Sequence, residues 1–134
     1  MVRHLREKGL SVDVVSTDAD GPHTSIDPST LPAELVDARL FKRTLSETWK
    51  YSRQLNQWLS ASIKAYDLVH IHALWSYSSQ AGARAALANS VPFVLRPAGL
   101  LSAFSWQNKG LRKQLYWQLI ENKTVQAAAA FHAT

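Results

Sequence analysis

Two short apolar segments of this sequence end in side chains that can hold an anion or move a proton. Residues 67–72 run Asp-Leu-Val-His-Ile-His and end at His72, and residues 92–96 run Pro-Phe-Val-Leu-Arg and end at Arg96. An imidazole at such a position can hydrogen-bond a hydroxyl or a phosphate group, or act as a general base. A guanidinium presents a fork of donors that suits a phosphate or a carboxylate. Both residues are therefore candidate ligand contacts.

Each of these candidates also has a purely structural interpretation. His72 could hydrogen-bond a neighbouring backbone carbonyl. Arg96 could form an internal ion pair with Asp67 or Glu121, because burying an unpaired charge is costly. His70 lies two positions before His72, inside the same apolar segment, and is predicted to be a packed core histidine.

Other candidates lie close to these two in the sequence. Gly99 follows Arg96 and would let the backbone approach a ligand. Trp75 and Tyr77 follow His72, and their rings could stack on a sugar, although core packing explains at least one of them equally well. His132 also lies at the end of an apolar segment.

The elements that must position these residues alternate along the chain. Strands are predicted at 11–16, 38–42, 67–72, 92–96 and 129–134, and helices at 2–8, 47–63, 76–88 and 109–126. Gly9 is predicted to end the first helix, and Ser76 to begin the third. Alternating strands and helices predict an α/β fold, with a Rossmann-like parallel sheet and helices on both faces. Ligands bind such sheets outside the carboxyl ends of the strands, here the segments 17–20, 72–76 and 96–101.

Composition narrows the class of protein. The chain has 134 residues, enough for one domain, and its 46% hydrophobic and 19% charged residues are typical of a globular protein. It has no cysteine, so disulfides and thiolate metal sites are excluded. Neither a secretory leader nor an apolar run of membrane-spanning length is present, so a cytoplasmic location is expected.

The charge balance favours anionic partners. Fifteen Lys and Arg against ten Asp and Glu give a net charge of +5. These charges are spread along the chain, and no nucleic-acid-binding module accompanies them, so nucleic acid is not expected as a partner. The basic and aromatic segment 106–117 fits either peripheral contact with the inner face of a membrane or a solvated helix face.

Taken together, four segments resemble group 1 (family 4) glycosyltransferases. Residues 66–77 resemble the strand motif of that family that carries two histidines and a tryptophan. Residues 92–101 resemble its proline- and glycine-containing segment, in the Arg-Pro-x-Gly form of a branch acting on bacterial surface polysaccharides. Residues 113–134 and 9–16 resemble two further stretches in the same order.

This resemblance implies a GT-B fold, in which two Rossmann-like domains face a cleft. The chain would correspond to the N-terminal, acceptor-side domain, with His72, Trp75, Arg96 and Gly99 as its substrate-binding residues. A hexosyltransferase-type parent enzyme is implied, which moves a sugar from a nucleotide-sugar to a polysaccharide or lipid-linked acceptor with retention. Neither a metal nor a cofactor is implied, since the nucleotide-sugar is a co-substrate held mainly by the other domain.

The sequence also departs from that family. The first strand, its Gly-rich loop and the C-terminal donor domain are missing, so residues 1–134 are expected to be a partial domain that is inactive alone. A genuine start at Met1, with the helix leading the fold, stays open. Ala98 stands where some relatives carry His or Arg. A non-catalytic Rossmann-like module or subunit, binding an anionic sugar or a membrane surface, is the alternative function.

Overall fold

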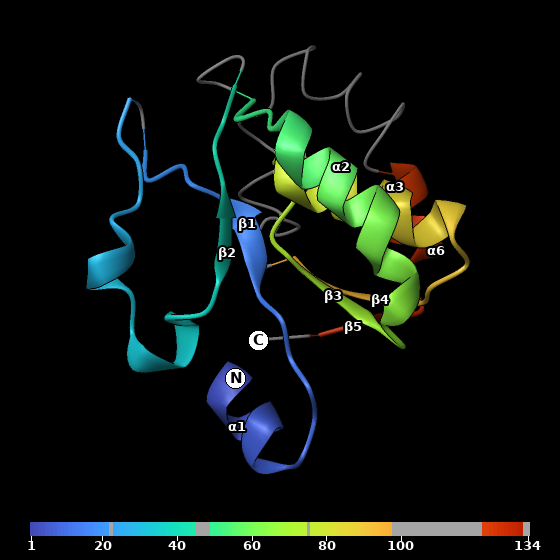
Figure 1. The fold of residues 1–134 in the computed structure, drawn as a ribbon. Helices are drawn as coiled ribbons and strands as arrows, with labels where there is room; N and C mark the ends of the chain where they lie inside the picture. The colour runs from blue at the N-terminus through green and yellow to red at the C-terminus, as the bar shows by residue number, and fades with distance from the viewer. Residues whose placement is uncertain (22, 45–48, 75, 98–121, 133–134) are drawn as a thin grey trace, which may run out of the picture. The chain divides into compact units, whose positions relative to one another are not determined.

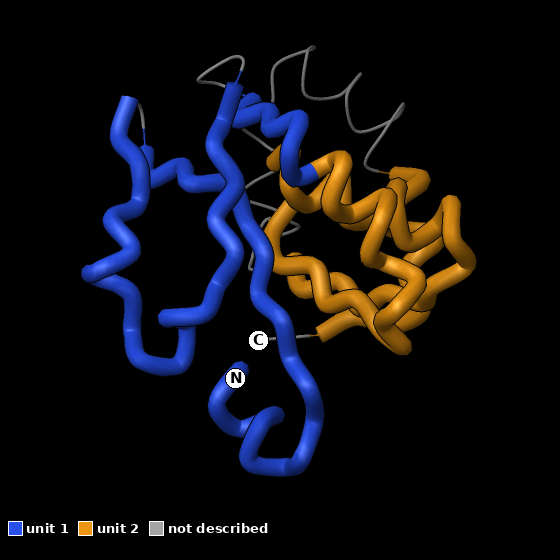
Figure 2. Tube along the Cα trace, in the orientation of Figure 1, with its two compact units in different colours: residues 1–55 blue, residues 56–134 orange. Residues whose placement is uncertain are grey.

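The structure is a computed structural model that describes residues 1–134 except positions 22, 45–48, 75, 98–121 and 133–134. Its described residues form two compact units, residues 1–55 and residues 56–134, which Figure 2 distinguishes by colour. We call them the N-terminal unit and the C-terminal unit. The predicted helix at 109–126 falls largely outside the described residues, as do Trp75, Ala98, Gly99 and the segment 106–117.

A small parallel sheet forms the centre of the N-terminal unit. Helix α1 (Val2–Glu7) precedes strand β1 (Val15–Thr17), two 3-10 turns, η1 (Pro28–Thr30) and η2 (Ala33–Leu35), and strand β2 (Arg39–Phe41). Strands β1 and β2 run parallel, with Val15 opposite Arg39 and Thr17 opposite Phe41. The strand predicted at 11–16 is therefore shorter than expected and lies later in the chain, whereas the one predicted at 38–42 is confirmed.

Helix α1 ends as the sequence predicts. Gly9 adopts a φ of +82°, a left-handed conformation that costs glycine little. Its amide donates to the Arg6 carbonyl at 2.9 Å, and the Leu10 amide donates to the Leu5 carbonyl at 3.2 Å. These two bonds satisfy carbonyls that the helix itself leaves open, as in a Schellman motif.

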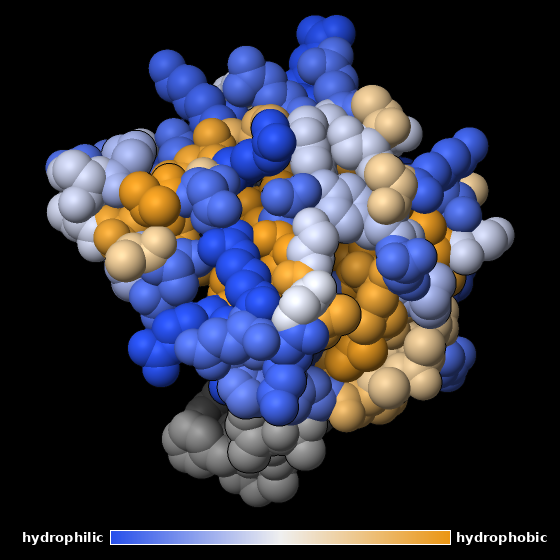
Figure 3. Space-filling view, turned by 60° about the horizontal axis from the view of Figure 1, so that its bottom comes forward, coloured by the Kyte–Doolittle hydropathy of each residue, from blue (hydrophilic) through white to orange (hydrophobic). Residues whose placement is uncertain are grey.

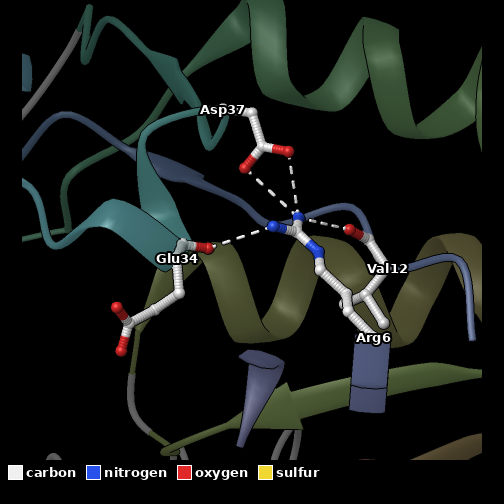
Figure 4. Close-up of polar contacts among 4 residues, drawn as sticks. All are labelled: Arg6, Val12, Glu34 and Asp37. Atoms are coloured by element: carbon white, nitrogen blue, oxygen red, sulfur yellow. Dashed lines mark hydrogen bonds and ion pairs between the residues drawn. The ribbon is translucent and has the colours of Figure 1, made fainter. Parts of the chain in front are cut away.

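Arg6 ties α1 to the segment that follows η2 (Figure 4). Its Nη2 atom donates to both carboxylate oxygens of Asp37, at 3.2 and 3.0 Å, and to the Val12 carbonyl at 2.7 Å. Its Nη1 atom donates to the Glu34 carbonyl at 3.2 Å. One guanidinium thus joins the helix, the chain leaving it and the turn before β2.

Three parallel strands form the sheet of the C-terminal unit, in the order β3-β4-β5 (Figure 1). The elements of this part of the chain are α2 (Arg53–Ser62), η3 (Ile63–Ala65), β3 (Val69–His72), α3 (Tyr77–Ala88), β4 (Phe93–Arg96), α6 (Asn122–Ala127) and β5 (Ala130–Phe131). Strand and helix alternate from β3 to β5, as the sequence predicts. The α/β, Rossmann-like fold class is therefore confirmed.

Helix α3 covers the apolar face of this sheet. Ile71, Phe93 and Leu95 leave the face of the sheet opposite to His70, His72 and Arg96, and they are at most 5% exposed. Gly82 of α3 approaches Ile71 closely, since a Cβ atom placed on Gly82 would lie 3.9 Å from the Ile71 side chain. The predicted close approach of an alanine-rich helix is thereby confirmed, with Ala83 and Ala86 fully buried.

The boundaries of α3 match the prediction, whereas those of α2 do not. Ser76 caps α3 by accepting a hydrogen bond from the Ser79 amide, and Asn89 ends the helix. The helix predicted from residue 47 begins at Arg53, so that prediction is wrong for residues 49–52, while residues 47 and 48 lie outside the described residues. The Ser52 hydroxyl accepts a hydrogen bond from the Leu55 amide, which is the geometry of a helix start.

The surface carries both hydrophilic and hydrophobic side chains. Blue, hydrophilic side chains are spread over the face shown in Figure 3, with hydrophobic residues between them. None of the helices in the described part of the chain has the length and apolar character needed to cross a membrane.

Candidate functional site

The parallel register of the C-terminal unit places His72 and Arg96 side by side. His72 pairs with Arg96 as the last residue of β3 beside the last residue of β4. The amide of the next residue, Ala73, donates to the Arg96 carbonyl at 2.9 Å. Because side chains at paired positions of parallel strands leave the same face, the two basic groups share one face of the sheet at its carboxyl edge.

The first turn of α3 fixes the end of β3. The Ser79 hydroxyl, on a residue that is 4% exposed, donates to the His72 carbonyl at 3.1 Å. The Ser76 and Ser79 hydroxyls lie 2.7 Å apart, which connects this bond to the helix cap. Ala73, which directly follows His72, adopts a φ of +66°, a left-handed conformation that costs a residue with a Cβ about 1 kcal/mol. Non-glycine residues held in this conformation cluster at functional sites.

Two more histidines join the same face. His70 lies two positions before His72 on β3, and the two ring centroids are 4.6 Å apart. His132 follows β5, and its amide donates to the Leu95 carbonyl at 2.9 Å. The His132 Nδ1 and His70 Nε2 atoms lie 3.3 Å apart, so one ring donates a hydrogen bond to the other. We call His70, His72, Arg96 and His132 the basic cluster.

Neither His70 nor His132 was among the substrate-binding residues predicted from the sequence. His70 was predicted to be a packed core residue, but it is only partly buried and contacts both other histidines. His132 is brought to the site by the pairing of Phe131 with Leu95. The only sequence signal for His132 is its place at the end of an apolar segment, and joining it and His70 to the site requires the register of the strands.

The surroundings disfavour positive charge on these rings. Burial lowers the pKa of His72 below its ordinary value of 6.5, and the charges of Arg96 and His132 lower it further. Burial also lowers the pKa of His70, with smaller contributions from His72, His132 and Arg96. Both imidazoles are therefore neutral at neutral pH, and each can accept a proton or a hydrogen bond.

Arg96 has no carboxylate partner among the described residues. Its Nε atom is buried and makes no hydrogen bond within that part of the chain. The alternative interpretation of Arg96, an ion pair with Asp67, is not seen among the described residues, and Glu121 lies outside them. A buried guanidinium nitrogen that has no partner among the described residues is costly, so Arg96 is suited to bind a further hydrogen-bond acceptor.

The comparison with known families decides what kind of domain carries this site. A family model described as a glycosyl transferase 4-like domain matches residues 1–134. The chain belongs to the glycosyl transferase 4-like family. Searches of the curated proteins and of the solved structures returned no match.

Membership of the glycosyl transferase 4-like family confirms the resemblance inferred from the sequence motifs. Of the four substrate-binding residues predicted for this domain, the structure brings His72 and Arg96 together. Trp75 and Gly99 lie outside the described residues, and their roles stay predictions. In the described part of the domain, no three His, Asp or Glu side chains are arranged to hold a metal ion.

Proposed function

We propose that this chain is the acceptor-side part of a glycosyltransferase that transfers a sugar from a nucleotide-sugar to a polysaccharide or lipid-linked acceptor, with retention of configuration. Support comes from the family match over residues 1–134 and from the pairing of His72 with Arg96 at the carboxyl edge of a parallel sheet. That edge is where open α/β sheets bind their ligands. The pairing is the single observation that carries the proposal.

The proposed division of labour follows from the chemistry of the residues. Arg96 offers a fork of donors to an anionic or hydroxyl-rich acceptor, and His72, the more exposed of the two, can orient an acceptor hydroxyl or take its proton. Trp75 and Gly99 are proposed to complete the contacts. The nucleotide-sugar would be held mainly by a second domain. A location in the cytoplasm, with peripheral contact at the inner face of the membrane, belongs to the same proposal.

A non-catalytic module is the competing function, because the basic cluster could also hold an anionic sugar without any transfer. The transferase and the binding module differ in the role of the acceptor-side residues. In a transferase their loss removes turnover, whereas in a binding module there is no turnover to remove.

The test is a transfer assay with a panel of labelled nucleotide-sugars and a lipid-linked acceptor. The purified 134-residue chain is expected to give no product, since donor and acceptor must be held together for transfer. The complete protein encoded around this sequence is expected to transfer sugar. Failure of the complete protein to transfer from every donor, combined with saturable acceptor binding, would instead identify a binding module.

A further inference from the structure

Within the residues that the structure describes, the basic cluster has no internal counter-charge. Arg96 and the three histidines come from the ends of three adjacent strands, and no ion pair joins any of them to a carboxylate in the described part of the chain. Neighbouring positive charges repel one another, so the cluster is destabilised whenever its imidazoles are protonated. An anion from outside the chain would reverse that effect.

The arrangement of donors indicates which anion fits. Arg96 supplies a planar fork, and its Nε atom is a buried donor without a partner among the described residues. His72 and His132 stand beside it, each with a ring nitrogen that can donate when protonated. Donors from three separate strands suit a tetrahedral group with several oxygens better than a planar carboxylate. A cation is disfavoured, because the Arg96 charge would repel it.

We propose that the basic cluster binds a phosphate or phosphodiester group of the acceptor, and that the anion binds together with a proton taken up by the cluster. The inference rests on the proposed function only for the identity of the ligand as an acceptor. No covalent step is involved, since the proton comes from solvent and is returned to it when the anion leaves.

The coupling of anion and proton follows from the neighbours of each ring. Within the C-terminal unit, the charged and titratable groups that act on His72 are Arg96 and His132, and those that act on His70 are His72, His132 and Arg96. The first effect of burial and of these charges is to keep the rings neutral. A bound anion offsets the Arg96 charge, so protonation of His72 then adds a hydrogen bond to the anion.

The His70 and His132 pair makes this response stepwise. Their facing nitrogens lie 3.3 Å apart and share one hydrogen, so protonating both at those atoms would break the bond and bring two charges together. His70 can therefore fix the tautomer of His132, which directs the opposite ring nitrogen of His132 away from the pair. His70 is a positioning residue in this account.

Sulfate is the probe for the first experiment, because its charge is constant between about pH 5.5 and about pH 8, the range in which histidine titrates. Histidine ring signals of the 134-residue chain are followed by NMR during sulfate titrations at both pH values. Binding is expected to be at least about tenfold tighter at the lower pH, and saturating sulfate is expected to raise the titration midpoint of His72.

Substitutions distinguish sulfate binding at the basic cluster from general attraction of sulfate to a positively charged protein. Arg96→Gln and His132→Gln are expected to weaken binding at the lower pH by about tenfold or more, whereas Arg84→Gln, which removes an exposed charge on α3, leaves it unchanged. Arg96→Lys keeps the charge but not the fork, and it supplies a folded variant if Arg96→Gln fails to fold. His4→Gln on α1 is the control for loss of an imidazole.

Three results would overturn the proposal: equal sulfate affinity at both pH values, a loss of affinity in Arg84→Gln equal to that in Arg96→Gln, or no shift of the His72 signals when sulfate is added. Glucose 1-phosphate and detergent-dispersed farnesyl phosphate then distinguish the source of the phosphate. Tighter binding of farnesyl phosphate indicates a lipid-linked acceptor, whereas equal binding of the two compounds indicates that the site recognises the phosphate alone. None of these measurements contains a nucleotide-sugar. A negative result in the sulfate experiments would therefore not contradict the proposed sugar transfer. A negative result in the transfer assay would not contradict the proposed anion site.

Discussion

His72 and Arg96 stand opposite one another as the final paired residues of β3 and β4, and both leave the same face of the sheet. The segments that carry them are separated in sequence by the whole of α3. The crossover of strand, helix and parallel strand is thus what converts two isolated basic residues into one site.

The bond from the Ser79 hydroxyl to the His72 carbonyl gives the first prediction. Ser79→Ala is expected to lower the free energy of unfolding by about 1 kcal/mol, because the partly buried His72 carbonyl loses the donor supplied by the buried Ser79. Ser60→Ala is the matched control, since the Ser60 hydroxyl also donates to a carbonyl but on an exposed helix surface. Chemical denaturation measures both, and an equal change in the two variants would contradict the anchoring role of Ser79.

Stability is expected to fall as the solution becomes acidic. His70 and His72 have lowered pKa values in the folded chain, so the unfolded chain binds more protons below its ordinary histidine pKa of 6.5. The free energy of unfolding should therefore decrease as the pH drops below about 6.5, and added sulfate should restore part of it.

The double variant His70→Gln with His72→Gln is expected to flatten this pH dependence, while His4→Gln should retain it. Thermal or urea unfolding across the pH range provides the measurement. A double variant as acid-sensitive as the original chain would show that other groups cause the loss of stability.

Two glycines should respond in opposite directions to the same substitution. Gly82→Ala is expected to stabilise the chain by about 0.5–1 kcal/mol, because the new methyl group meets Ile71 at an ordinary contact distance and alanine favours a helix interior. Gly9→Ala is expected to destabilise it by about 1 kcal/mol, because Gly9 has a φ of +82°. Stabilisation by both substitutions would contradict the conformation assigned to Gly9.

The Arg6 contacts predict a difference between two arginines of α1. Arg6→Ala removes bonds to Asp37 and to the Val12 and Glu34 carbonyls, and is expected to cost about 1–2 kcal/mol. Arg3→Ala removes only an exposed pair with Glu7 and is expected to cost less than about 0.5 kcal/mol. Urea unfolding distinguishes the two, and equal costs would argue against the Arg6 anchor.

Local signals were sufficient to predict much of this fold. Ser76 and Asn89 bracket α3 because side-chain capping is decided by residues adjacent in sequence. Gly9 marks the end of α1 for the same reason, since only glycine accepts its conformation cheaply. The start of α2 was missed because an apolar periodicity continues through Tyr51, while the Ser52 hydroxyl sets the first turn.

The site was predicted in part, because its composition depends on pairing between strands. His72 and Arg96 could be placed at strand ends from sequence, and the topological rule for parallel sheets brought them to one edge. His70 and His132 could not be joined to them without the register of β5, which is only two residues long. Register is a tertiary property that short strands specify weakly.

The most direct test of the central claim compares Arg96→Ala with Arg84→Ala in the complete protein, measuring both sugar transfer and the thermal midpoint. If Arg96 contacts the acceptor, its loss should lower kcat/KM by about a hundredfold or more while the midpoint stays close to that of Arg84→Ala. Parallel losses of activity and thermal stability in Arg96→Ala, or full activity without the guanidinium, would contradict the assignment of this sheet edge as the acceptor site.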